Sequence, residues 1–283
     1  MANKLDLRAP RDVKSLHQAF RDSHDSSDLE ATFRWLDQVD RNPSIQELKK
    51  RMLDLSPVRR GDRVLDVGCG LGHELARLSR RVGTEGLVFG VDANPYTIAE
   101  ARRRAAGENV TVALDVGDAQ HLAFADDFFD LCRTERVLRY LESPEAALRE
   151  MARVVRPGGF VVAFDFDSDQ TIVDARDSAL TRRVAAMLDA AVPHPWIGRQ
   201  LFRLYRRAGL IDVLVAPHAI CLSGATGFAI YRQINAGTIA RAAQAGLITP
   251  TEVAAWWATL KSAAATETFF SANLGFIAIG RKP

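Results

Sequence analysis

The sequence predicts an α/β fold: a doubly wound, mostly parallel sheet of seven strands with helical segments that form a lid. Short apolar runs alternate with amphipathic helical patterns through the first two thirds of the chain. Alternation of this kind is typical of a parallel sheet with helices on both faces. Three glycines at alternate positions directly follow the first apolar run, Val64–Val67, and a helical pattern begins behind them. A strand, a glycine turn and a helix N-terminus in this order indicate a nucleotide-cofactor site.

The expected strands are short apolar runs bounded by turn residues. They cover residues 64–67, 86–92, 110–114, 128–133, 160–165, 211–215 and 269–280. Before the first strand, apolar residues at helical spacing predict helices over 28–41, with Ser27 or Asp28 as N-cap, and after Asn42. The Pro157-Gly158-Gly159 run is expected to break the helix that precedes the fifth strand.

The chain is expected to divide into three parts. Residues 1–57 form an N-terminal helical lid, 58–167 a cofactor-binding core, and 168–283 the rest of the sheet. The last part contains two helical cap insertions, 168–200 and 224–262, which interrupt the strand pattern.

Composition limits the classes of function. A net charge of +2 over 283 residues does not favour nucleic acid as a partner. Three widely spaced cysteines give neither a disulfide framework nor a metal pair, and no metal is expected. No apolar run of about 18 residues and no signal-peptide pattern occurs, so a cytoplasmic location without a membrane span is expected.

The glycine turn has a spacing that narrows the cofactor. It reads Asp66-x-Gly68-x-Gly70-x-Gly72, with Cys69 between the first two glycines. The dinucleotide fingerprint G-x-G-x-x-G, counted from Gly68, would require glycine where His73 stands. The pattern therefore disfavours a nicotinamide-dependent oxidoreductase, although a plain tight turn between strand and helix is the simplest alternative.

Asp92 ends the second predicted strand, about 20 residues beyond the glycine turn. An acid at this place binds ribose hydroxyls in nucleotide-binding βαβ units. An acid that caps the next helix is the alternative, because Asn94-Pro95 follows. We favour ribose binding, since spacing and context agree.

Four segments in order resemble the class I S-adenosylmethionine-dependent methyltransferases. They are VLDVGCGLG, GVDANP, GDAQ and FFDLCRTERVLRYLESPEAALREMARVVRPGGFVVAFDFD, within residues 62–167. The chain is similar to the small-molecule branch, which includes quinone-biosynthesis and natural-product tailoring enzymes. The resemblance implies a Rossmann-like fold, S-adenosylmethionine as cofactor and S-adenosylhomocysteine as product. At Arg139-Tyr140 the sequence departs from the branch, where a histidine often stands.

The resemblance also implies roles for individual residues. Asp118 would accept a hydrogen bond from the exocyclic amine of adenine, and the backbone N–H of Ala119 would donate to a ring nitrogen. Thr134 would contact the cofactor through its backbone. Asp66 would orient the amino-acid end of the cofactor or the glycine loop. Cofactor binding is therefore expected at Asp66, Gly68, Cys69, Gly70, Asp92, Ala93, Asp118, Ala119 and Thr134.

The helical segments carry many of the aromatic residues and are expected to enclose a small, apolar or aromatic acceptor. The candidates are Phe20, Trp35, His194, Trp196, Arg199, Tyr231 and Asn235. His194 would be the general base, with a surface position as the alternative, and helix packing is an alternative for each aromatic. The loop from His194 to Arg199 is expected to face the methyl group. A methyltransferase that acts on RNA or protein is the second hypothesis, and a monomer or homodimer is expected.

Overall fold

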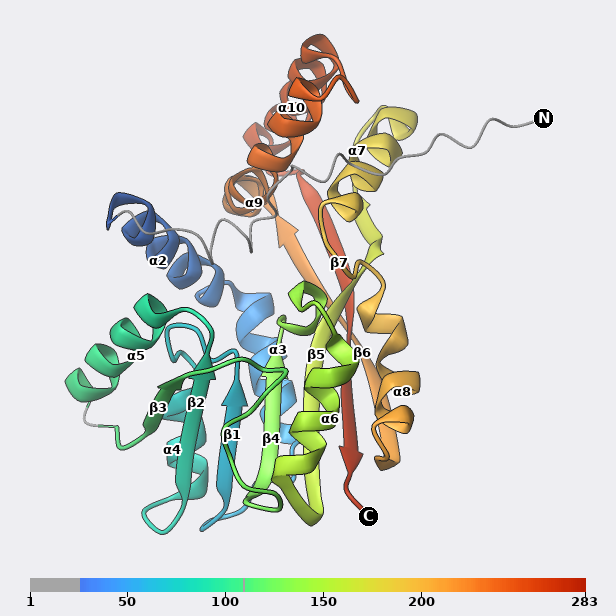
Figure 1. Cartoon of the computed structure of the whole chain (residues 1–283). Helices are drawn as coiled ribbons and strands as arrows, with labels where there is room; N and C mark the ends of the chain where they lie inside the picture. The colour runs from blue at the N-terminus through green and yellow to red at the C-terminus, as the bar shows by residue number, and fades with distance from the viewer. Residues whose placement is uncertain (1–25, 109) are drawn as a thin grey trace.

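The computed structural model describes residues 26–108 and 110–283 (Figure 1). Phe20 and the first part of the predicted lid lie outside the described residues, and so do the side chains of Ser27 and Asp28. Seven strands form one sheet in the order β3-β2-β1-β4-β5-β7-β6. The fold is therefore a Rossmann-like α/β fold, as the sequence predicts.

In chain order, the strands are β1 Arg63–Val67, β2 Leu87–Asp92, β3 Ala113–Val116, β4 Phe129–Glu135, β5 Val155–Val173, β6 Ile211–Ser223 and β7 Phe270–Arg281. The sheet is mixed, because β7 runs antiparallel to both of its neighbours while the pairs among β1 to β5 are parallel.

Helices cover both faces of the sheet. They are α2 Ser26–Asp40, α3 Pro43–Leu55, α4 Leu75–Val82, α5 Pro95–Gly107, the 3-10 turn η1 Leu138–Tyr140, α6 Pro144–Val154, α7 Ser178–Ala190, α8 Ile197–Arg207, α9 Gly224–Gln244 and α10 Pro250–Ala265. Asparagine caps begin two of them: Asn42 caps α3 and Asn94 caps α5, each through a side-chain oxygen that accepts backbone N–H groups.

Two apolar layers sandwich the sheet. One layer packs α3, α4 and α5 against the strands through residues such as Leu48, Leu78 and Ile98. The other packs α6 and α8, with Leu148 and Tyr205 fully buried. Burial on both faces explains why the inner strands are almost continuously apolar in sequence.

The strands β5, β6 and β7 extend well beyond the cofactor-binding strands (Figure 1). The helix before β5 ends at Val154, and the Pro157-Gly158-Gly159 run lies within β5, where its backbone pairs with Lys282 and a register shift accommodates the run opposite β4. At its other end β5 continues past residue 167, where the sequence placed a boundary, to Val173. The proposed division of the chain remains a prediction.

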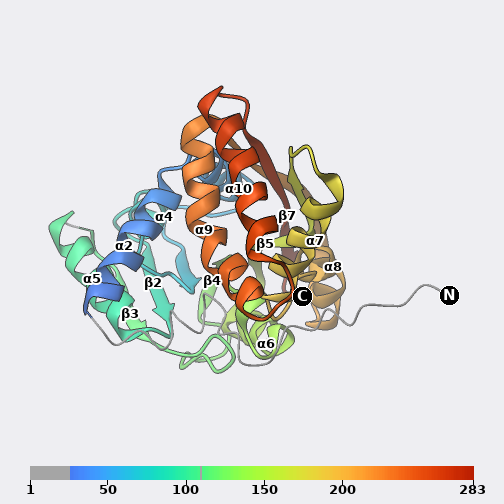
Figure 2. The same cartoon turned by 90° about the horizontal axis from the view of Figure 1, so that it is seen from above.

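Helices α7, α9 and α10 gather around this extension of the sheet (Figure 2). Their contacts form a third apolar cluster that contains Val184, Tyr231, Trp256 and Phe269. Trp256 is buried there with its ring 4.9 Å from that of Trp257. These two tryptophans therefore pack between helices, which is the alternative to a place in the acceptor pocket.

Candidate cofactor and acceptor site

One cavity of about 770 Å³ lies at the carboxyl ends of β1, β2 and β4. Its lower wall is the glycine loop with the ends of these strands, and its upper walls come from α2, α3, α7, α9 and the extension of β5, β6 and β7. This is the edge where ligands bind in doubly wound sheets. The volume is within the range of small-molecule and cofactor sites.

The glycine loop needs glycine for two different reasons. Gly68 has a φ of +73°, and a Cβ at this position would overlap the Val137 side chain. Gly70 has a φ of +53°, but a Cβ there would meet no atom within 4 Å. The N–H groups of Gly68 and Cys69 both donate to the Val91 carbonyl, at 2.7 and 3.0 Å, which anchors the loop to β2. The open side of Gly70 therefore faces the cavity, where a ligand can approach the backbone.

Asp92 lines the cavity at the end of β2 and holds the loop above it. One carboxylate oxygen accepts the Gly70 N–H at 2.9 Å, and the other accepts the Asn94 N–H at 2.9 Å and the Thr97 hydroxyl at 3.1 Å. The N-cap of α5 is Asn94, so the alternative in which Asp92 serves as the cap of this helix does not apply. Each oxygen of a carboxylate can accept further bonds, so Asp92 is able to bind ligand hydroxyls as well.

The other residues expected to bind the cofactor line the same cavity near the ends of β2 and β3. Ala93, Asp118 and Ala119 all line it. Asp118 accepts the backbone N–H of Gln120 at 2.9 Å, and half of its side chain is exposed. Its carboxylate is thus held by the loop and available to a ligand. Together with Asp66, Gly68, Cys69, Gly70 and Asp92, these residues are brought to one cavity.

Thr134 is the one predicted cofactor residue that the structure places outside the cavity lining. Its hydroxyl donates to the Val67 carbonyl at 2.8 Å and is completely buried. The side chain therefore joins β4 to β1 and does not face the ligand.

Replacing Thr134 with valine should lower stability and leave cofactor affinity unchanged. The loss of a buried hydrogen bond costs about 1–3 kcal/mol when a carbonyl is left unsatisfied. Urea unfolding measures the first quantity, and titration with S-adenosylhomocysteine measures the second. Thr259→Val is the control, because that exposed hydroxyl donates to the carbonyl of Ala255 in its own helix. A large change in affinity with unaltered stability would contradict this assignment.

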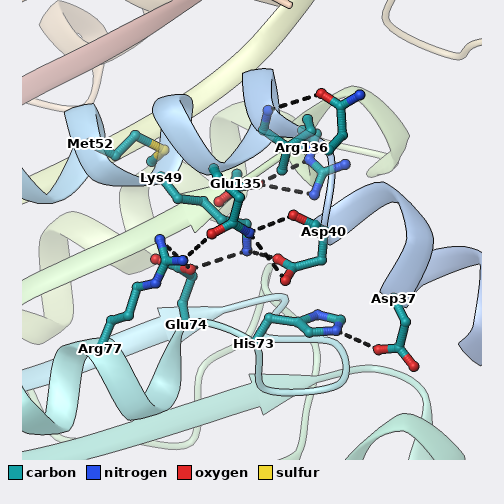
Figure 3. Close-up of polar contacts among 12 residues, drawn as sticks. Asp37, Asp40, Lys49, Met52, His73, Glu74, Arg77, Glu135 and Arg136 are labelled. Carbon is teal, nitrogen blue, oxygen red and sulfur yellow. Dashed lines mark hydrogen bonds and ion pairs between the residues drawn. The ribbon is translucent and has the colours of Figure 1, made fainter. Parts of the chain in front are cut away.

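A buried network of charges lies beside the loop in the cavity wall, and sequence analysis did not anticipate it (Figure 3). Lys49 of α3 forms ion pairs with Asp40 at 2.8 Å and Glu74 at 3.2 Å. Arg133 of β4 pairs with Glu74 at 3.1 Å and Glu135 at 3.0 Å. All except Asp40 have side chains no more than 8% exposed. The network joins α2 and α3 to the carboxyl ends of the strands.

Asp66 lies at the edge of this network, with one oxygen 3.6 Å from the Arg133 guanidinium. Burial raises the pKa of Asp66 to about 6, although the charge of Arg133 opposes the shift. For Glu135 burial also opposes ionisation, but Lys49, Arg136 and Arg133 together lower its pKa to about 2. Glu135 is thus negatively charged throughout the physiological pH range, whereas Asp66 gains its proton at a pH only slightly below neutral.

Lys49→Met should destabilise the fold by about 3–5 kcal/mol, because it removes one of the two cations that balance the buried carboxylates of this network. The free energy of unfolding in urea measures the effect. The neighbour Lys50 is the matched control, since its side chain is 66% exposed and forms an ion pair with Asp54, which is also exposed. Lys50→Met is expected to stay within about 0.5 kcal/mol of the parent protein. Equal stabilities of the two variants would show that the network does not support the fold.

A second set of contacts fastens α2 across the loop. Asp37 accepts from His73 at 2.7 Å and from Arg104 of α5 at 2.6 Å. His73, the residue in place of the third glycine, therefore holds a helix over the cavity. The hydrogen bond from Arg104 lowers the pKa of Asp37 against the effect of burial.

The predicted acceptor residues divide into two groups. Trp35, Tyr231 and Asn235 line the cavity. Trp196 is 51% exposed. The Arg199 guanidinium forms hydrogen bonds with Asp167 and lies over the Trp196 ring. Neither side chain reaches the cavity lining.

His194 also differs from expectation. Its Nε2 lies 2.9 Å from the Leu141 carbonyl, which can only accept, so Nε2 carries the proton and donates. His194 is not among the residues that line the cavity, although its near neighbours Ala191 and Val192 are. The structure thus turns the His194–Arg199 side chains away from the cavity.

Neither a membrane span nor a metal cluster is found in the part of the chain that the structure describes. No helix in residues 26–108 and 110–283 is long and apolar enough to cross a bilayer. The same residues contain no group of three or more histidine, cysteine or carboxylate side chains arranged to hold a metal ion.

Residues 65–163 match a family model described as a methyltransferase domain. The Ubiquinone/menaquinone biosynthesis C-methyltransferase UbiE of Chromobacterium violaceum is 37% identical over 114 residues, which are 40% of this chain and 47% of that protein. An uncharacterized 37.1 kDa protein of transposon TN4556 from Streptomyces fradiae is 37% identical over 185 residues, 65% of this chain and 53% of its own. The chain thus spans about half the length of these curated relatives.

Among solved structures, the YcgJ protein of Bacillus subtilis has the same fold, with a TM-score of 0.59 at 17% identity over 84% of this chain and 99% of that one. Residues 65–163 therefore form a methyltransferase domain, and the resemblance seen in the sequence is confirmed. The cofactor of this domain is S-adenosylmethionine, as the resemblance implies.

Proposed function

We propose that the whole chain transfers the methyl group of S-adenosylmethionine to an oxygen, nitrogen or carbon atom of a small, apolar or aromatic molecule. The observation that carries this proposal is the single cavity, which joins the glycine loop and Asp92 to an apolar chamber. Leu188, Ile220, Ile230 and Tyr231 line that chamber. A cofactor and an acceptor in one enclosed space meet the requirement for in-line displacement, which is close approach without water.

The chain's own residues have distinct tasks in this proposal. Gly68 and Gly70 let the backbone approach the cofactor, Asp92 accepts ribose hydroxyls, and Asp118 with Ala119 binds adenine. The cofactor supplies an activated methyl group on a sulfonium, so no metal and no covalent nucleophile of the protein is required. The helices α2, α7 and α9 exclude water from the reacting atoms.

The second hypothesis is a methyltransferase that acts on RNA or protein. Against it, the acceptor walls are apolar side chains from α7, α9 and β6 rather than a basic groove. The test is incubation of the purified protein and labelled S-adenosylmethionine with a cell extract separated into metabolites, RNA and protein. We expect label in a small molecule, and label confined to RNA or protein would contradict the proposal.

A further inference from the structure

The acceptor chamber contains a carboxylate that sequence analysis did not single out. Asp189 lies in the last turn of α7 and lines the cavity. Its side chain is half-buried, and among the described residues it has no hydrogen bond and no ion pair. The aspartates whose carboxylates support the fold, such as Asp92 and Asp130, have two or more such bonds. Asp189 is therefore free to bind a ligand.

The wall around Asp189 combines apolar and polar groups. Phe166, Leu188 and Asn273 line the same chamber, and so does the cationic side chain of Arg139. The side-chain oxygen of Asn273 is itself buried and out of reach of a ligand in the chamber. Asp189 is thus a hydrogen-bond acceptor in a largely apolar wall. A ligand with a donor group on an apolar skeleton fits this chamber.

The charges around Asp189 come from several elements. Asp167 and Asp169 approach it from β5, Arg139 from η1 and Arg199 from α8, while Tyr231 and Asn235 of α9 are uncharged. Burial and then Asp169 raise the pKa of Asp189 to about 6, against the effect of Arg139. The carboxylate therefore loses its charge about two pH units above an ordinary aspartate.

Arg139 decides which kind of donor the chamber favours. It lines the same cavity, with its guanidinium held by the Ser168 hydroxyl at 2.6 Å and near the rings of Tyr140 and Phe166. A fixed positive charge there repels an ammonium group and stabilises an oxygen that becomes negative. Arg139, where the sequence departs from the family pattern, thus favours an acceptor that is methylated on oxygen over one that carries an ammonium group.

On the basis of the proposed function, we infer that Asp189 is the catalytic residue that binds the hydroxyl group of an apolar acceptor and takes its proton, so that methylation occurs on oxygen. The acceptor's O–H bond breaks and its proton passes to the Asp189 carboxylate, while the oxygen bonds to the methyl carbon. The methyl–sulfur bond breaks with its electron pair remaining on sulfur, which turns the sulfonium into a neutral thioether. Charge is balanced, because one anion and one cation are both neutralised.

Binding can test this assignment without turnover. The probes are single-ring, fused-ring and biaryl phenols, each with its methyl ether and its aryl amine, titrated into protein saturated with S-adenosylhomocysteine. At least one phenol should bind about tenfold more tightly than its ether, because hydrogen bonds to charged groups are stronger than neutral ones. Asp189→Asn should remove that preference. Asp169→Asn is the matched control, since its exposed carboxylate pairs with Arg199 outside the cavity.

The pH dependence gives a second readout. Phenol binding to the parent protein should weaken as pH falls below about 6, where Asp189 becomes protonated, and binding to Asp189→Asn should not change there. The midpoint should move to lower pH in Asp169→Asn, because a neighbouring negative charge is removed. Equal affinity of all phenols and their ethers, or a preference that survives in Asp189→Asn, would overturn the assignment. Failure of S-adenosylhomocysteine to bind would instead overturn the proposed function, and titration of the unliganded protein with the same phenols would still test Asp189.

Discussion

Asp92→Ala should weaken the binding of S-adenosylhomocysteine by at least tenfold while the protein stays folded. The change removes the acceptor for the ribose hydroxyls, and charge-assisted hydrogen bonds are each worth about 1.5–3 kcal/mol. It also releases the Gly70 N–H, which Asp92 holds at 2.9 Å, so the loop becomes less well ordered for the ligand. Calorimetric titration gives the dissociation constant.

Asp115→Ala is the control for this prediction. Asp115 lies at a strand end on the same sheet edge, in β3, but is exposed and does not line the cavity. Its variant should bind the ligand as the parent protein does. An unchanged dissociation constant for a folded Asp92→Ala variant would remove Asp92 from the site.

Gly70→Ala should likewise abolish most cofactor affinity at only a modest cost in stability. At a φ of +53° alanine is strained by about 1–2 kcal/mol, and no protein atom within 4 Å obstructs its methyl group. The new methyl group projects into the cavity, where the ligand must approach the backbone. We expect at least a tenfold loss of affinity for S-adenosylhomocysteine.

A second glycine distinguishes the effect of backbone strain from the effect of a methyl group that obstructs the ligand. Gly61 has a φ of +85° and also has no atom near its Cβ position, but it lies before β1 and away from the cavity. Gly61→Ala should lower the melting temperature about as much as Gly70→Ala and leave affinity unaltered. Equal affinities in the two variants would show that the glycine loop does not contact the ligand.

The parts of the site that could be predicted from sequence are local. The glycine loop, Asp92 and Asp118 are each defined by a few residues next to a strand end, and all of them line the cavity. The φ angles and the anchoring of Gly68 to β2 follow from that local pattern.

The parts that could not be predicted depend on distant contacts. Lys49 and Glu74 are joined to Arg133 only because α3 packs against the end of β4, and helical spacing gave Lys49 no special place. The extension of β5 was missed because the stretch from Asp165 to Gln170 is mostly polar, whereas the pairing of Thr171 to Val173 with β7 keeps the strand continuous. With β5 ended too early, the chamber around Asp189 could not be placed.

The aromatic residues of the expected lid illustrate the same limit. Trp35 and Tyr231 line the cavity, but Trp256 is buried against Tyr231 and Trp257 in the third apolar cluster. Trp196 is exposed near Arg199. Helical spacing alone does not distinguish a side that faces a ligand from a side that faces another helix.

The most direct measurement is a pair of calorimetric titrations, one with S-adenosylhomocysteine and one with NAD. The spacing that ends at His73, the cavity beside Gly70 and the methyltransferase domain at residues 65–163 all predict binding of S-adenosylhomocysteine at one site per chain and no binding of NAD. Binding of NAD without binding of S-adenosylhomocysteine would contradict the account.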